Sequence, residues 1–385
     1  MKKIERAAVV FGLVLLSASA AGAGEIIYEK GDKKIEIGAR IQLQYTQIDP
    51  DGAESVDELF FRRLRPYIAG TVSKDWWGKI QFDFGKSLDA DEVAVRDAYI
   101  QYKGWDNIKL TIGNSKTPFS REFMSSSKRQ QGVERNFVGA HNFGVPDRQL
   151  GLRLDGNSMG KKLTWIAIAG SESHDPGVRR MDFDSPANRQ FDWNQGWIAS
   201  ARLDLHPMGH VKFDQGDFRS DEIKLRFGLG AFTWSNDGDR NLYTDDGVSN
   251  SRSKADLDSA IGIEIGVGLR GKGISVDAEY QIVSGETVDP AFSGGIYVDG
   301  ETELKKISLE GGYMLSGNRF EIVGSWEQMD ADGYEQPWQA TLIGFNYFFN
   351  RHKVKAQFNY IFGENVFGVA GVDANTIHLR MQFVF

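Results

Sequence analysis

The sequence predicts an all-β fold, a transmembrane antiparallel β-barrel of about sixteen strands with a long third loop folded into its lumen. Three observations carry this prediction. Segments of about ten residues repeatedly alternate apolar and polar side chains, the chain ends directly on such a segment, and long links alternate with short ones. The composition agrees, because 44 glycines, only 9 prolines and 12% aromatic residues suit a large antiparallel sheet better than helices.

The last ten residues, TIHLRMQFVF, show the alternation most clearly. One face is apolar and the other is largely polar, since successive side chains of a strand point to opposite faces. The apolar face holds Ile377, Leu379, Met381, Phe383 and Phe385. Chain termini fray unless a sheet holds them. A barrel in lipid has no free edge, because no water is there to satisfy the backbone. We therefore expect barrel closure at Phe385, with the last strand paired to the first.

The same pattern recurs along the chain. In residues 257–271, Ile263 and Ile265 share one face and Glu264 lies on the other. A tilted strand of about ten residues covers roughly 25 Å, the height of the apolar band of a bilayer. The segments begin near residues 35, 60, 77, 94, 107, 148, 161, 196, 223, 257, 273, 304, 319, 338, 352 and 376. The segments near 161 and 338 are the least defined, because both of their faces carry apolar residues.

The links between the segments alternate in length, as expected when long loops lie at one rim and short turns at the other. The long links are 114–147, 170–195, 234–256 and 283–303, and the short ones are 73–76, 104–106, 271–272 and 316–318. One link breaks the rule, since 206–222 is long where a short turn is expected.

Residues 1–23 are expected to be a signal peptide. Lys2, Lys3 and Arg6 precede the apolar run 7–16, and Ala21-Gly22-Ala23 fits the small-x-small cleavage pattern. The alternative is a buried N-terminal helix. Cleavage would leave residues 24–385 as the barrel domain. An exported chain that crosses lipid as strands is expected in the outer membrane of a bacterial cell.

Composition and motifs exclude several other functions. The chain has 53 acidic against 45 basic residues, which argues against a nucleic-acid partner, and no cysteine that could form a disulfide or bind a metal. No cofactor is expected.

His206 and His210 lie in HPMGH, which predicts a turn rather than a metal pair. The acidic stretches 235–241 and 244–247 could hold calcium, although a solvated loop is favoured. No Ser–His pairing can be argued from spacing, so an outer-membrane hydrolase is set aside and no enzyme is predicted.

The link after the fifth strand is the longest and the most basic. Residues 114–148 carry a formal net charge of +3, whereas the chain has −8 before and −10 after removal of residues 1–23. Four phenylalanines within it indicate that it packs. We expect this loop to fold into the lumen, narrow the pore and present cations, the alternative being a solvated surface loop. A barrel of about sixteen strands leaves an aqueous lumen, so passive diffusion of small solutes is the default function, with selection at the narrowest ring.

Several blocks resemble a known family. FFRRLRPYIAGTVSKDWWGKIQFDFG, VRDAYIQYKGWDNIKLTIGNSKTPFSRE, VERN and RQLGLRLDG, in this order and spacing, are similar to the phosphate-selective porins O and P. The resemblance implies a trimeric sixteen-stranded porin with an inward third loop, and lumen arginines and lysines that guide anions such as phosphate. Phe385 also resembles the C-terminal signature that the barrel-assembly machinery recognises. The expected partners are outer-membrane lipid, small anionic solutes, two further copies in a homotrimer, and that machinery.

Basic residues of the third loop and of the RRLR motif are the predicted pore constriction on the anion path: Arg62, Arg63, Lys116, Arg121, Lys128, Arg129 and Arg135. Basic residues on the polar face of the strands are the predicted lumen lining: Arg40, Arg65, Lys79, Lys109, Arg153, Lys224, Arg226, Lys353, Lys355 and Arg380. Acidic residues share that face: Glu36, Asp83, Asp97, Asp155, Glu264, Asp277, Glu279, Glu310, Glu321 and Glu327.

This mixture departs from a uniform basic ladder. A general or weakly selective diffusion porin is therefore the alternative to an anion porin for phosphate or related oxyanions. An alternative of another class is a non-conducting structural or adhesive outer-membrane barrel.

Overall fold

The computed structural model describes residues 24–87, 90–91, 93–188, 194–238 and 254–385. The expected signal peptide and most of the two acidic stretches considered for calcium lie outside the described residues. No helix in the described ranges is long and apolar enough to cross a membrane.

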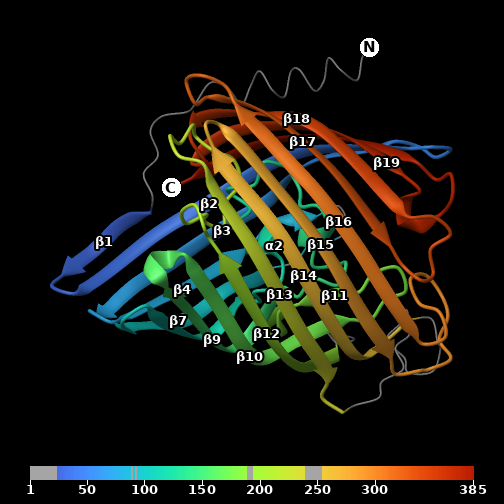
Figure 1. Cartoon of the computed structure of the whole chain (residues 1–385), viewed down its shortest axis with the longest axis horizontal. Coiled ribbons are helices and arrows are strands. Elements are labelled where there is room, and N and C mark those ends of the chain that lie inside the picture. Colours follow the sequence, from blue (N-terminus) through green and yellow to red (C-terminus); the bar gives the residue numbers. More distant parts are fainter. Residues whose placement is uncertain (1–23, 88–89, 92, 189–193, 239–253) are drawn as a thin grey trace.

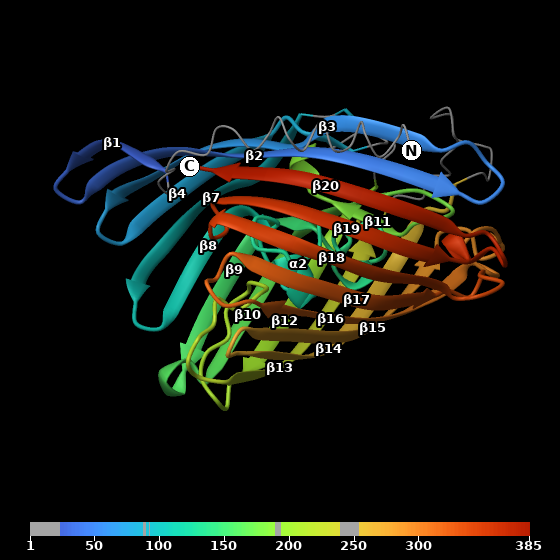
Figure 2. The same ribbon diagram turned by 90° about the horizontal axis from the view of Figure 1, so that it is seen from above.

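Sixteen strands close into one antiparallel barrel (Figures 1 and 2). They are β2 (Lys33–Pro50), β3 (Val56–Ser73), β4 (Trp76–Asp83), β7 (Ala94–Trp105), β8 (Ile108–Lys116), β9 (Arg148–Ser158), β10 (Leu163–Asp175), β12 (Asn194–Leu205), β13 (Lys224–Asn236), β14 (Leu257–Gly271), β15 (Ile274–Thr287), β16 (Glu301–Met314), β17 (Phe320–Asp330), β18 (Trp338–Asn350), β19 (Val354–Glu364) and β20 (Ala374–Val384). The strands expected near 161 and 338 are confirmed as β10 and β18.

The remaining elements are short. The strands are β1 (Glu25–Lys30), β5 (Lys86–Ser87), β6 (Ala90–Asp91) and β11 (Asp182–Asp184). The helices are α2 (Arg121–Met124) and the 3-10 turns η1 (Phe137–Gly139), η2 (Met159–Lys161), η3 (Pro186–Asn188) and η4 (Val366–Gly368). β1 pairs with β2 in a hairpin that projects beyond the barrel (Figures 1 and 2).

The barrel closes where the last strand meets the first. β20 pairs with β2 along its length, from Val384 opposite Arg40 to Ala374 opposite Pro50. Phe385 continues the ladder, because its N–H donates to the Ala39 carbonyl at 3.1 Å and its carbonyl accepts from Ala39 N–H at 2.9 Å. The predicted closure is confirmed down to the last residue.

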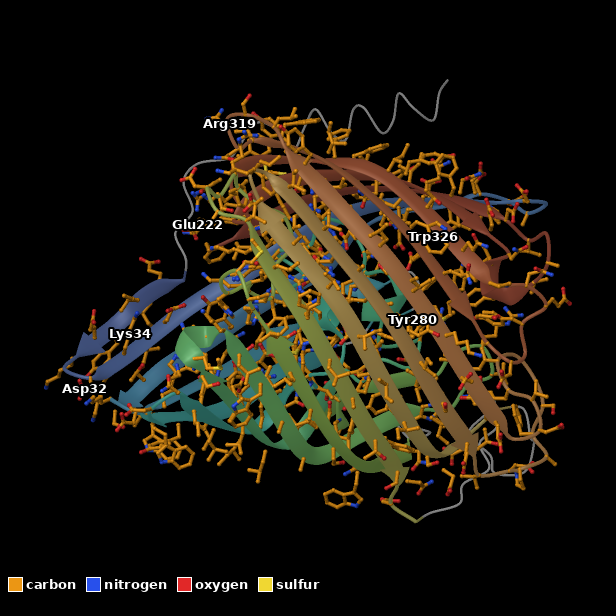
Figure 3. All side chains as sticks on the ribbon, in the orientation of Figure 1. Asp32, Lys34, Glu222, Tyr280, Arg319 and Trp326 are labelled. Atoms are coloured by element: carbon orange, nitrogen blue, oxygen red, sulfur yellow. The ribbon has the colours of Figure 1, made fainter. Side chains whose placement is uncertain are left out.

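The two faces of the barrel differ as the alternation predicts. On β14, Ile263 and Ile265 are each 54% exposed on the outside, while Glu264 between them is fully buried inside. Tyr280 and Trp326 likewise lie on the outer surface (Figure 3). An outer band of exposed apolar side chains is what a barrel presents to lipid.

Long loops lie at one rim and short turns at the other, as predicted, and the link after β12 is the predicted exception. Short turns join β3–β4, β7–β8, β9–β10, β14–β15, β16–β17 and β18–β19 at one rim, whereas residues 206–223 form a long link at that rim. The third loop, residues 117–147, lies inside the barrel, where α2 is visible in Figures 1 and 2. Its Phe119 and Phe123 are buried in an apolar cluster, and its inward position is confirmed.

Candidate functional site: the lumen constriction

A β-bulge places two successive arginines of β3 on the lumen side. Gln42 of β2 pairs with Arg63, but the next residue, Leu43, pairs with Phe61, so Arg62 is an extra residue. A bulge of this kind re-aims a side chain that strict alternation would send to the other face. The sequence RRLR therefore presents both neighbouring cations to the third loop.

Glu134 of the third loop meets three arginines. Its carboxylate lies 2.9 Å from Arg62 Nε, 3.6 Å from Arg63 Nη2 and 2.5 Å from Arg380 Nη2. Burial opposes the charged form, yet the three guanidinium groups hold the pKa of this carboxyl well below its usual range. Glu134 was not predicted as a site residue, and it neutralises part of the charge of Arg62 and Arg63.

A second bulge, on β7, brings Arg96 into the lumen. Gln81 pairs with Asp97 while Phe82 pairs with Val95, which leaves Arg96 as the extra residue. Its guanidinium lies 3.1 Å from the carboxylate of Asp147 in the third loop. Strand parity gives no signal for this residue, because the bulge breaks the period of two.

Most other basic side chains on this wall are paired with a carboxylate. The distances are 2.6 Å for Arg65–Asp83, 2.6 Å for Lys79–Asp97, 3.7 Å for Lys109–Asp155, 2.7 Å for Arg148–Asp147 and 2.6 Å for Arg153–Asp155. The opposite charges of each pair largely cancel for an ion some distance away. These residues therefore line the lumen but add little to its net charge.

Four cations on the same side have no carboxylate partner among the described residues, and we call them the unpaired cationic cluster: Arg40, Lys116, Lys128 and Arg135. Arg40 of β2 donates to the hydroxyls of Ser127 at 2.5 Å and Ser126 at 3.1 Å. These serines belong to the third loop, so the hydrogen bonds fix the loop against the wall while the positive charge stays uncompensated.

Lys116 and Arg135 are held by the third loop without being neutralised. Lys116 Nζ donates to the Phe123 carbonyl and, at 3.2 Å, to the Ser125 carbonyl, at the C-terminal end of α2. Arg135 donates to the same Ser125 carbonyl at 3.2 Å and lies 5.2 Å from the centre of the Phe123 ring. Cations are favoured at a helix C-terminus, which explains why the local sequence accepts both of them.

Lys128 differs from the other three, because its ammonium group makes no hydrogen bond or ion pair within the described part of the chain. Burial, followed by repulsion from Arg40, lowers the pKa of Lys128 to about 8. Burial also lowers the pKa of Arg135 to about 10, so Arg135 stays charged at neutral pH. Lys128 is thus a member of the cluster whose charge titrates near physiological pH.

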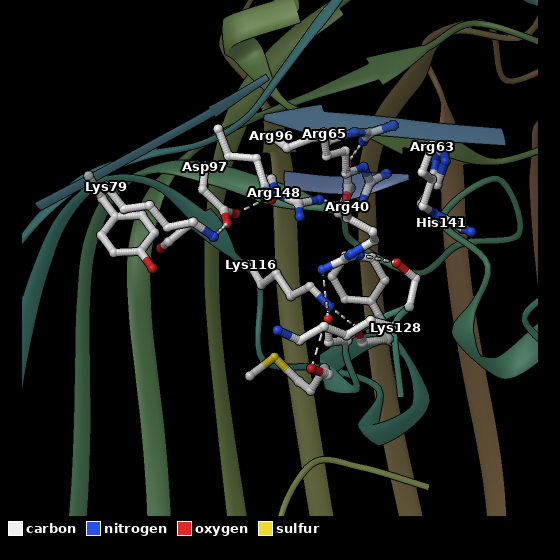
Figure 4. A pocket seen from close by; sticks show the side chains of 18 of the residues that line it. Arg40, Arg63, Arg65, Lys79, Arg96, Asp97, Lys116, Lys128, His141 and Arg148 are labelled. Carbon is white, nitrogen blue, oxygen red and sulfur yellow. Dashed lines mark hydrogen bonds and ion pairs between the residues drawn. The ribbon is translucent and has the colours of Figure 1, made fainter. Parts of the chain in front are cut away.

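The cluster borders a cavity of about 340 Å³ (Figure 4). Twelve lysines and arginines line this cavity together with only two carboxylates, those of Asp97 and Asp147. Arg40, Lys116 and Lys128 lie close together in Figure 4. The arrangement can attract and hold a small anion through several charged donors, and it repels cations.

The opposite wall uses its acids to hold the third loop. Glu279 of β15 accepts hydrogen bonds from the backbone N–H groups of Arg121 and Glu122, both at 3.0 Å. Glu310 of β16 accepts from Gly132 N–H at 3.3 Å, and Glu327 of β17 accepts from the third loop as well. The acids that anchor the third loop thus lie on β15–β17, whereas the cations that border the cavity lie on β2–β9 and on the third loop.

The remaining predicted residues lie away from this cavity. Arg121 is fully buried and lies 3.0 Å from Asp277, and Arg129 lies 3.6 Å from Asp214. Arg226 is paired with Asp204 at 2.6 Å, and Lys355 donates to the Gln130 carbonyl at 2.6 Å. Lys224 is the first residue of β13, and Lys353 lies in the turn 351–353 rather than in a strand. His206 and His210 stack with ring centres 4.6 Å apart, and no group of three or more metal-ligand residues occurs among the described residues.

Two comparisons of the sequence with known proteins indicate the family that this chain resembles. The family model for phosphate-selective porin O and P matches residues 35–193. Porin O of Pseudomonas aeruginosa is 27% identical over 345 residues, covering 80% of this chain and 75% of that protein. The chain is thus similar to the phosphate-selective porins O and P, most clearly over residues 35–193. The predicted resemblance is confirmed, and the chain is a porin of the bacterial outer membrane.

Solved structures share the fold at low identity. OmpT of Vibrio cholerae is 11% identical with a TM-score of 0.59, covering 94% of this chain and 100% of that one. The DcaP channel of Acinetobacter baumannii is 13% identical with a TM-score of 0.56, covering 94% and 100%. An anion-selective porin from Comamonas acidovorans is 10% identical with a TM-score of 0.57, covering 92% and 100%. At these identities the likeness concerns the barrel alone.

Proposed function

We propose that this porin conducts small anions by passive diffusion, that it prefers phosphate and related oxyanions, and that the unpaired cationic cluster is its selectivity site. The observation that carries the proposal is the absence of a carboxylate partner for all four cations of the cluster, among the described residues, where the third loop narrows the lumen. Low-dielectric walls strengthen the action of such charges on a passing ion.

The chemistry of the cluster favours an oxyanion over a halide. The guanidinium groups of Arg40 and Arg135, the ammonium group of Lys128 and the hydroxyls of Ser126 and Ser127 supply donors from several directions. The ammonium group of Lys116 donates to three loop carbonyls and contributes its charge. Phosphate offers several acceptor oxygens that can engage these donors together, whereas chloride is a single acceptor. The names of the matching family and of the Comamonas porin point the same way.

A weakly selective porin remains the second candidate, since paired cations such as Arg65 and Lys79 add little net field. Single-channel recording separates the two. Phosphate added in millimolar amounts to a chloride solution should block chloride current through the pure protein in a saturable way. A chloride current that phosphate leaves unchanged would favour the weakly selective porin, and a protein without any conductance would favour a structural barrel.

Assembly as a homotrimer is part of the proposal. A trimer form of the Vibrio cholerae OmpT fold neighbour is known, and family resemblance implies the same arrangement. Cross-linking of the detergent-solubilised protein, or its mass by light scattering, tests this state directly.

A further inference from the structure

The exceptional link between β12 and β13, residues 206–223, folds into the lumen from the rim of short turns, and we call it the inward turn. His206, Val211 and Gln215 within it are buried to 5% exposure or less. A connection of this length at the short-turn rim is unusual in a barrel of this plan and calls for a function.

The inward turn is bonded to the third loop at several points. Gln215 Oε1 accepts from Gln131 N–H at 2.7 Å, and the Gln215 N–H donates to the Arg129 carbonyl at 3.2 Å. Arg121 Nη2 donates to the Asp214 carbonyl at 2.8 Å. Gln215 Nε2 also donates to Glu310 of β16 at 2.8 Å, so one side chain joins the turn, the loop and the wall.

The two halves of the lumen differ in their access to solvent. Seven polar lumen-side residues of β12–β19 are at most 2% exposed: Arg202, Glu264, Gln281, Lys306, Glu321, Lys355 and Gln357. The other wall also has fully buried residues such as Gln42 and Gln149, but there the side chains of Arg62 and Lys109 stay 25% and 37% exposed. The buried polar groups of β12–β19 bind the third loop and each other, because buried polar groups are usually hydrogen-bonded.

Two cavities lie beside the wall formed by β2–β10. The first is the cavity of the unpaired cationic cluster. The second, about 570 Å³, is lined by Lys161 next to a short turn and by His210 and Lys212 of the inward turn. Lys109 borders both cavities, which places them along one route through the barrel.

We propose that the inward turn is a specificity-determining element of the channel. Together with the third loop it closes the half of the lumen bounded by β12–β19 and confines solutes to a route along β2–β10, past the unpaired cationic cluster. The consequence for anions rests on the proposed function, whereas the closure of one half does not depend on which ion the pore prefers.

The absence of cysteine in this chain makes thiol accessibility a clean test. Ser126 lines the open cavity, while Ser275 on β15 is fully buried and accepts from Gln131 Nε2 at 2.7 Å. Ser126→Cys and Ser275→Cys are matched, nearly isosteric changes. In bilayers, a charged methanethiosulfonate reagent should modify Ser126→Cys rapidly and reduce its current. Ser275→Cys should stay unmodified, and comparable reaction at both positions would overturn the proposal.

The bracing role needs its own variant. In the Ser275→Cys background, Gln215→Ala removes the hydrogen bonds to the third loop and to Glu310, and modification should accelerate by roughly tenfold. Asp221→Asn, on an exposed part of the same turn, is the control and should change nothing. Equal rates for both variants would refute the bracing role. The reaction at Ser126→Cys is measured with one anionic and one cationic reagent, which separates the two proposals. Faster reaction with the cationic reagent would contradict anion selection, but it would not contradict the closure of the half of the lumen bounded by β12–β19.

Discussion

Lys128 is the residue at which the selectivity of the pore should respond to pH. Burial and Arg40 lower its pKa to about 8, so the ammonium group is largely charged at pH 7 and largely neutral at pH 9. Raising the pH removes a positive charge from the constriction, and anion selectivity should therefore fall over this interval. Reversal potentials under a fixed chloride gradient at pH 7, 8 and 9 measure the change.

Lys128→Arg is the matched control, because a guanidinium keeps its charge over this range. The variant should match the native protein in selectivity at neutral pH and lose less of it as the pH rises. A profile with the same slope in both proteins would assign the titration to another group.

Ile265 should report which face of the barrel meets lipid. It lies near the middle of β14 and is 54% exposed, so Ile265→Arg should cost roughly 2–4 kcal/mol of folding free energy at the bilayer midplane. Met159→Arg, in an exposed short turn, should cost about 0–1 kcal/mol. Glu264→Arg is no suitable control, because Glu264 is buried 2.8 Å from Arg202. Urea titration in lipid vesicles gives both values, and equal costs would place Ile265 away from lipid.

At the scale of elements, the strands were predictable and the neighbours of the third loop were not. Water inside and lipid outside impose a period of two on every strand, which is why the predicted strand positions are confirmed, including those near 161 and 338. Parity fails where a bulge adds a residue, as at Arg96. It also cannot reveal partners distant in sequence, such as Asp277 for Arg121. Loop charge and family resemblance had placed Arg121 on the anion path.

Glu134 offers a test of how the third loop sets the charge of the constriction. Glu134→Gln removes the carboxylate that forms ion pairs with Arg62, Arg63 and Arg380. Anion selectivity should rise, while the unfolding temperature should fall because three arginines lose their shared partner. Reversal potential and thermal unfolding of the purified variant measure the two effects. A decrease in anion selectivity would mean that these arginines do not face the anion path.

At the scale of the whole molecule, closure depends on the last residue. Phe385 exchanges two backbone hydrogen bonds with Ala39, at 2.9 and 3.1 Å, which are the final links of the seam between β20 and β2. Deleting Phe385 should lower the amount of folded, heat-modifiable protein in the outer membrane and leave export unchanged. Phe385→Ala keeps the backbone bonds and should be less affected. Normal folded levels after the deletion would refute a role of Phe385 in closure.

The acidic and basic side chains of the lumen have different roles, which the overall net charge does not show. The chain is acidic overall, with a formal net charge of −8, yet the acids of β15–β17 bind the backbone of the third loop and the cations of β2–β9 line the cavity. Salt screens the acids beyond about 8–10 Å, so an ion in the constriction responds mainly to the nearby cations. An acidic porin can therefore select anions.

The reversal potential of the purified protein in a planar bilayer under a potassium chloride gradient tests this account most directly. The native pore should be anion-selective, and Arg40→Gln, Lys128→Gln and Arg135→Gln combined should shift the potential towards cations. The control combines Lys30→Gln, Lys33→Gln and Lys74→Gln, which removes the same charge from exposed positions at the rim and should change little. A native pore that prefers cations, or equal potentials for the two triple variants, would contradict anion selection by the unpaired cationic cluster.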